Sequence, residues 1–190
     1  MVHAKDMRAD ARRNRDRILE AARLLVAETG VDATMEDIAR RAGVAVGTLY
    51  RHFPAKEDLV AAVVEDSLLQ MAALSEGAMA AVHAGARPGA TLTALFREVA
   101  ERHATDQAFK SVSGRLDMSA EIAEAAPGSA VARSVEAITA LLERAQAAGE
   151  IRDDVTLADL ALLLGSVPGA DVPAPMRARF VDIVVAGLAP

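Results

Sequence analysis

Cysteine is absent from the 190 residues, and aromatic residues make up only 3% of them. Without cysteine the chain can form no disulfide, no thiolate metal site and no cysteine nucleophile. The composition therefore fits a reducing compartment, and we expect the protein in the cytoplasm. So few aromatic residues also argue against an aromatic cage for a planar cationic ligand.

Long apolar segments are missing as well. A helix needs about 18 consecutive apolar residues to span a bilayer, and no run in the sequence approaches that length. The first residues are charged rather than apolar, so we expect no signal peptide. The sequence thus predicts no membrane partner.

Motifs for catalysis and metal binding are likewise absent. The sequence contains no G-x-S-x-G run and no P-loop run, and His83 and His103 stand 20 positions apart without a His-x-x-x-His step. We therefore expect no enzymatic activity, no metal site and no cofactor. An acid and a base that converge in one cleft would revive an enzyme as the alternative.

The residues that are present favour helices. Alanine is abundant, β-branched residues are scattered, and 52% of the residues are hydrophobic, which indicates an all-α protein with a sizeable core. Apolar residues recurring every three or four positions, with Gly and Pro breaks between them, predict about nine helices. Their expected ranges are 13–29, 34–42, 46–53, 55–82, 91–104 and 109–116, followed by helices that begin near residues 129, 156 and 175.

Helix ends can also be predicted. Ser129 is expected to cap one helix, Thr156 and Asp159 form a capping-box pattern, and Pro175 suits the first helical position. Ala55 stands where a capping side chain is needed, so the helix after it is expected to lack about 1 kcal/mol of stability. Residues 1–12 show no apolar period, and we expect a flexible arm there.

Charge is divided unevenly along the chain. Residues 1–56 carry 11 Lys and Arg against 8 Asp and Glu, whereas residues 57–190 carry 10 against 19. A basic N-terminal part joined to an acidic remainder indicates two roles, and hence two domains with these boundaries. Charge alone leaves a chance difference open as the alternative.

Residues 34–56, TMEDIARRAGVAVGTLYRHFPAK, form the most specific pattern in the sequence. Thr34 can cap the first helix, and Gly43 suits a turn that needs a positive φ. Ala39 is small enough for two helices to cross closely, and Leu49 and Phe53 form a buried pair four residues apart. Together these features predict a helix-turn-helix.

This stretch resembles the TetR family of bacterial transcriptional regulators. The matching residues are Thr34, Ile38, Ala39, Ala42, Gly43, Val44, Gly47, Thr48, Leu49, Tyr50, His52, Phe53, Lys56 and Leu59. The preceding helix RILEAARLLVAETG also fits. The closing segments LADLALLLGSV and PAPMRARFVDIVVAGL resemble a subgroup with a compact C-terminal body. The resemblance implies a homodimer with a three-helix DNA-binding head and a C-terminal body that binds a small molecule and dimerises.

The head is expected to contact duplex DNA through the following residues: Thr34, Ala45, Val46, Gly47, Thr48, Tyr50, His52 and Lys56. Short side chains at the start of a recognition helix admit base contacts, and apolar Val46 favours thymine methyl groups. Packing inside the head is the alternative role for Val46. Tyr50 and His52 match family positions that contact phosphates, and Lys56 adds its charge to a helix N-terminus. Arg8, Arg12 and Arg13 of the arm either follow the DNA or form a solvated tail.

The family places its ligand pocket among the middle helices. Candidate lining residues are Met71, Leu74, Leu92, Phe96, His103, Phe109, Leu116 and Ile138. Ordinary core packing is the alternative for each of them, and a bond to a neighbouring residue is the alternative for His103. The mostly aliphatic set suits a small apolar effector.

Dimerisation is expected through the last two helices, with Leu160, Leu164, Phe180, Ile183 and Val184 as candidates and packing within one chain as their alternative. The sequence as a whole predicts a repressor that a small ligand releases from a palindromic operator. The alternative function is a DNA-binding regulator that a protein partner controls instead.

Overall fold

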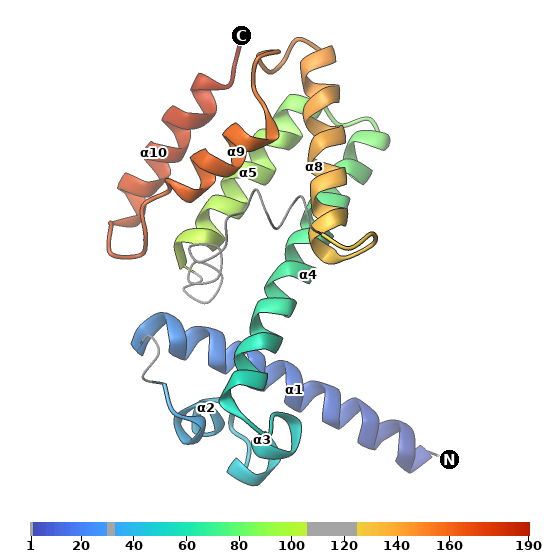
Figure 1. Ribbon diagram of the computed structural model, residues 1–190, viewed down its shortest axis with the longest axis vertical. Coiled ribbons are helices and arrows are strands. Elements are labelled where there is room, and N and C mark those ends of the chain that lie inside the picture. Colours follow the sequence, from blue (N-terminus) through green and yellow to red (C-terminus); the bar gives the residue numbers. More distant parts are fainter. Residues whose placement is uncertain (1, 30–32, 106–124) are drawn as a thin grey trace. The chain divides into compact units, whose positions relative to one another are not determined.

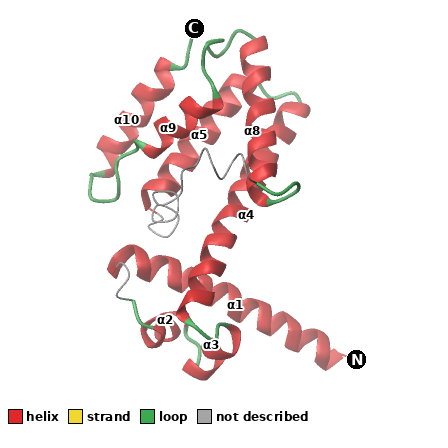
Figure 2. Ribbon diagram, in the orientation of Figure 1, coloured by secondary structure: helices red, strands yellow, loops and turns green. Residues whose placement is uncertain are grey.

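The computed structural model describes residues 2–29, 33–105 and 125–190, and these residues form eight α-helices and no strand (Figures 1 and 2). The helices are α1 (Val2–Thr29), α2 (Met35–Ala42), α3 (Val46–His52), α4 (Lys56–His83), α5 (Pro88–Thr105), α8 (Ala130–Ala147), α9 (Leu157–Gly165) and α10 (Ala174–Gly187). The predicted all-α class is confirmed, with a helix count close to the nine expected. The helix expected over residues 109–116 lies outside the described residues. None of the described helices combines the length and the apolar character that a membrane span requires.

The chain divides into two compact units, and the division falls between Asp66 and Ser67. This point lies inside α4, which therefore contributes residues to both units. The sequence placed the boundary after Lys56, where α4 begins.

Each helix of the first unit contributes an apolar side chain to the core of that unit. Ile18 of α1, Ile38 of α2, Leu49 of α3 and Leu59 of α4 are all at most 2% exposed and belong to one cluster. Because each such side chain gains roughly 1.5 to 3 kcal/mol from burial, this cluster holds the short helices α2 and α3 in place.

Helix α1 differs from the expectation at its start. It begins at Val2, so residues 2–12, which we expected to form a flexible arm, are helical. The segment contains no glycine or proline and is rich in alanine and arginine, which favour helix. An ion pair between Arg13 and Asp10, three residues apart, adds to this preference. Residues 10–13 are exposed, and an exposed helix needs no apolar period.

Helix α4 has a cap although Ala55 precedes it. Ala55 has no side-chain oxygen, but its N–H donates to Asp58 Oδ2 at 3.0 Å. This is the carboxylate half of a capping box. The helix therefore lacks only the hydroxyl half of the expected cap.

The second unit is organised around α5, which packs against α8, α9 and α10. Leu92 and Phe96 of α5 are 2% and 6% exposed, and Leu141 of α8 is fully buried in the same cluster. The start of α5 is fixed by Glu150, whose Oε2 accepts the Gly89 N–H at 2.7 Å and whose Oε1 accepts Arg87 Nε at 3.0 Å. A Cβ on Gly89 would lie 2.5 Å from the Glu150 Cβ, so this approach requires glycine.

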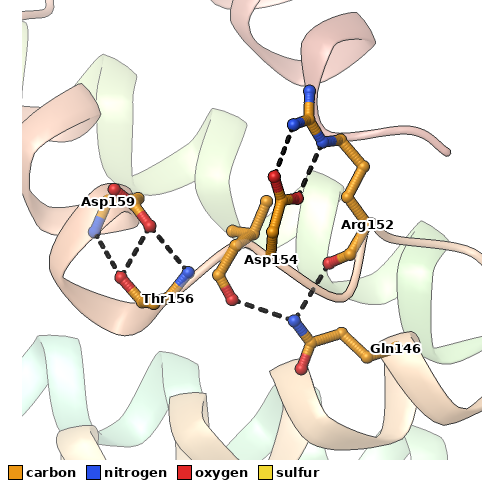
Figure 3. Close-up of polar contacts among 6 residues, drawn as sticks. Gln146, Arg152, Asp154, Thr156 and Asp159 are labelled. Atoms are coloured by element: carbon orange, nitrogen blue, oxygen red, sulfur yellow. Dashed lines mark hydrogen bonds and ion pairs between the residues drawn. The ribbon is translucent and has the colours of Figure 1, made fainter.

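The loop between α8 and α9 is held by a local polar network (Figure 3). Gln146 Nε2 donates to the carbonyl oxygens of Arg152 and Val155 at 3.0 and 2.9 Å. The Thr156–Asp159 capping box is present in full. The Thr156 hydroxyl donates to the Asp159 carboxylate, and this hydrogen bond lowers the pKa of Asp159. Both ends of the loop are thereby fixed where α8 stops and α9 begins.

Two other predicted helix starts can be compared with the structure. Ser129 caps α8 as expected, since its Oγ accepts the Ala132 N–H at 3.2 Å. Helix α10 begins one residue earlier than expected, so Pro175 occupies its second position rather than its first. Pro173 stands at the N-cap, where its missing N–H costs nothing.

Candidate nucleic-acid interface

The helix-turn-helix is built as the sequence pattern predicts. Gly43 adopts a φ of 64°, and its N–H and that of Val44 close the end of α2 on the carbonyls of Arg40 and Ala39. Ala39 is fully buried, which lets α2 and the following segment approach closely. Val44 is half-buried and packs against the same core. The turn therefore fixes the direction in which α3 leaves α2.

Helix α3 presents one face to solvent and the other to the core. Leu49 is fully buried and Phe53 is 4% exposed, whereas Val46 and Tyr50 are 39% and 42% exposed. Val46 and Tyr50 are four residues apart and share a face of the helix. Val46 and Tyr50 are therefore the large side chains that α3 presents to solvent.

Small residues precede and accompany these side chains. Ala45 is exposed at the N-cap of α3, and Gly47 has no heavy atom within 4 Å of the position that a Cβ would occupy. The fold itself therefore gives no reason for glycine at position 47. The missing side chain leaves the backbone open to a close approach at this position.

Thr34 and Thr48 have different surroundings. The Thr34 Oγ1 accepts the Asp37 N–H at 3.1 Å and donates to Asp37 Oδ2 at 2.6 Å. The hydrogen bond from the Thr34 hydroxyl lowers the pKa of Asp37 the most, and the hydrogen bond from Arg40 lowers it further. Since the one hydroxyl proton of Thr34 is already donated, capping is its role in this structure. Thr48 is half-buried on α3 and makes no such cap.

The C-terminal end of α3 gathers basic and aromatic groups from three helices. His52 is half-buried, and its ring lies 6.3 Å from that of Phe53. The Arg15 guanidinium of α1 lies 5.7 Å from the centroid of the same Phe53 ring. Lys56 begins α4, where its ammonium group adds to the positive end of the helix. Arg17 of α1 reaches the turn between α2 and α3, where it donates to the Gly43 carbonyl at 3.2 Å.

Arg15 and Arg17 were not among the predicted contacts. The run RRNRDR at residues 12–17 was the available signal. The run does not reveal that Arg15 and Arg17 lie beside Phe53 and Gly43, because these contacts join residues far apart in the chain.

Family comparisons agree with this geometry. Residues 18–63 match the model of the bacterial regulatory proteins of the tetR family. Residues 87–190 match the model of the SbtR-like transcriptional regulator C-terminal domain. The chain belongs to the TetR family. It is a DNA-binding transcriptional regulator and not an enzyme.

Two solved structures of TetR-family regulators resemble the whole chain. The TetR transcription regulatory protein from Mycobacterium vanbaalenii is 37% identical, with 97% of this chain and 99% of that chain covered and a TM-score of 0.71. The TetR transcriptional regulator SCO0520 from Streptomyces coelicolor is 32% identical, with 93% and 98% covered and a TM-score of 0.66.

A curated relative matches over part of the chain. The HTH-type transcriptional regulator SAUSA300_2515 of Staphylococcus aureus is 48% identical over 63 residues, which are 33% of this chain and 34% of the relative. The chain thus covers about a third of the length of that relative.

In this TetR-family regulator, the predicted ligand-binding residues line the core of the second unit. Leu92, Phe96 and His103 are at most 6% exposed and lie on one face of α5. Met71 and Leu74 of α4 and Ile138 of α8 are half-buried against the same cluster. Phe109 and Leu116 lie outside the described residues. The structure thus brings five of the eight candidates to one apolar cluster, with His103 buried on the same face of α5.

The predicted dimer residues are divided between core and surface. Leu160 is 5% exposed and belongs to the core of its own chain, which agrees with its alternative role of packing within one chain. Leu164, Phe180 and Val184 are half-buried against that core, and only Ile183, at 61%, is well exposed. Leu162 of α9 and Met176 of α10 are 70% and 63% exposed and were not among the predicted residues. Met176 stands seven residues before Ile183, on the same face of α10.

Proposed function

We propose that this regulator is a repressor whose exposed α3 face reads a near-palindromic operator and which leaves that operator when a small, mostly aliphatic molecule binds the second unit. The observation that carries the proposal is the exposure of Val46 and Tyr50 over a fully buried Leu49. A rigid core beneath short, exposed side chains is what a helix in the major groove needs. As a regulator of bacterial type, it acts on the chromosome in the cytoplasm.

The base contacts proposed are apolar. Ala45, Val46 and Gly47 offer no bidentate donor for guanine, so Val46 contacts thymine methyl groups, with Thr48 beside it. Tyr50, His52 and Lys56 position the head on phosphates, which carry no sequence information directly. Thr34 contributes by capping α2.

Ligand control is proposed from the apolar set on α5. Leu92, Phe96 and His103 offer aliphatic and aromatic surface with a single titratable group, which suits a weakly polar ligand. Helix α4 carries residues of both units, so a ligand that favours one arrangement of α4 also favours one spacing of the two heads in a dimer. A preference of about 1 to 3 kcal/mol between the two states lowers operator affinity about 5- to 150-fold.

The test begins with selection of bound duplexes from a random DNA pool by the full-length protein. We expect a near-palindrome with half-sites about one helical turn apart. Medium-chain aliphatic alcohols, acids and lactones are then screened for those that raise the melting temperature, and operator affinity is measured with and without each.

The expected result is weaker operator binding in the presence of a stabilising compound. No enriched duplex would refute operator binding. A compound that raises the melting temperature but leaves operator affinity unchanged would refute release by ligand, and would favour control by a protein partner.

A further inference from the structure

We propose that the N-terminal turns of α1 form a second DNA-binding surface, in which Arg12 and Arg15 contact phosphates beside the half-site that α3 reads. This inference rests on the proposed operator binding and extends it. It assigns a role to a basic segment that is helical where an arm was expected.

The contact between Arg15 and Phe53 fixes where this segment lies. The Arg15 guanidinium is 5.7 Å from the Phe53 ring centroid, and Phe53 ends α3. A cation held over an aromatic face keeps a defined position. His52, a predicted phosphate ligand, lies 6.3 Å from the same ring. Arg15 therefore stands at the end of α3 that faces the DNA backbone in the proposed complex.

The helix continues from Arg15 past this end of α3. Figure 1 shows the N-terminal part of α1 extending beyond α3. Arg12 precedes Arg15 by three residues, so the two share a face and lie about 4.5 Å apart along the helix axis. Arg12 is exposed, and among the described residues it has no ion pair. Residues 9–17 carry four arginines against two aspartates. The negatively charged phosphates of a DNA strand complement this excess of arginine.

The helical conformation of the N-terminal part of α1 also limits how it can contact DNA. An α-helix with its side chains is about 10 to 12 Å across, whereas the minor groove of B-DNA is about 6 Å wide. A helical segment cannot enter that groove as an extended arm does. Arg12 and Arg15 therefore bind phosphates along the groove edge and leave the sequence beside the operator unread.

The experiment compares the wild-type protein with Arg12→Gln on the selected operator. Two operator fragments are used, one with A·T-rich and one with mixed flanking sequence, across a series of salt concentrations. The matched control is Arg144→Gln, which removes an exposed arginine from α8 of the second unit. Glutamine retains helix propensity, and helix content is checked by circular dichroism for each variant.

Arg12→Gln is expected to weaken binding about 3- to 10-fold on both fragments alike, with the control unchanged. The magnitude of the slope of log affinity against log salt should fall by about 0.9 for each lost phosphate contact, and each protomer is expected to lose one contact. The inference would be overturned if Arg12→Gln bound the operator with wild-type affinity and a wild-type salt dependence. It would also be overturned if affinity were lost only on the A·T-rich fragment, because that result would indicate reading of the minor groove. If the wild-type protein enriches no duplex, both the inference and the proposed function fail.

Discussion

Val46 and Tyr50 occupy the same face of α3 but are proposed to act differently. Val46→Ala is expected to change which base is preferred at one operator position, with a loss of about 1 kcal/mol for the lost methyl contacts. Tyr50→Phe removes a single hydroxyl and is expected to weaken binding about 5-fold on all sequences alike, since a phosphate bond is worth about 1 kcal/mol. Competition binding against single-base operator variants separates the two effects.

Both residues are about 40% exposed, so neither substitution should change the free energy of unfolding by more than about 0.5 kcal/mol. Thermal melts therefore serve as the control for both variants. A uniform loss across all base variants for Val46→Ala would contradict direct base reading by Val46.

Residue roles that depend on local spacing were predictable. Gly43, Leu49 and Phe53 were assigned from a turn, a four-residue step and a helical period, and they are a positive-φ glycine and two core residues. Roles that depend on distant contacts were not predictable in this way. The position of Arg15 over Phe53 joins residues 38 positions apart, and a single sequence carries no signal for such a pairing.

At the scale of elements, the contact between Glu150 and the start of α5 links stability to pH. Hydrogen bonds from Arg87 and then from the Gly89 N–H lower the pKa of Glu150 below its ordinary value of 4.5. Its stabilising contribution is therefore fully present above about pH 4.5 and is lost as pH falls through the lower pKa of the folded state. Glu150→Gln is expected to lower the melting temperature at pH 7.

Melting curves from pH 7 to pH 3 test this expectation. The difference between Glu150→Gln and wild type should shrink as the pH falls from 4.5 through the lower pKa of the folded state, because the wild-type carboxylate is then protonated in the folded protein as well. Glu143→Gln, an exposed change on α8, is the control and should follow the wild type. A difference that stays constant with pH would show that the charge of Glu150 is not responsible.

The helix boundaries show which features of the sequence predict where a helix begins. The starts of α8 and α9 were predicted correctly because Ser129 and Thr156 cap them with their own side chains. The start of α1 was misplaced because an apolar period reports burial, and residues 9–17 are mostly exposed although helical. Helix propensity alone would have extended the helix toward Val2.

At the scale of the whole molecule, the proposed dimer face on α9 and α10 depends on which of their apolar side chains remain exposed. Apolar residues on α9 and α10 all follow a helical period, so periodicity cannot separate the side that packs on its own core from the side that meets a second copy. Leu160 is buried in its own chain, whereas Leu162, Met176 and Ile183 are more than 60% exposed, and we propose that this exposed side meets the second copy.

We therefore expect Ile183→Asp to convert a dimer to a monomer. Symmetry places this residue in the interface twice, and each buried isoleucine is worth about 1.5 to 3 kcal/mol, to which the cost of a desolvated carboxylate is added. Sedimentation velocity should show a single species of 19.9 kDa. Operator affinity should fall steeply because a monomer occupies only one half-site. Leu69→Asp, at a 45% exposed position on α4, is the matched control and should leave the dimer intact. A dimer that survives Ile183→Asp would place the interface away from this face of α10.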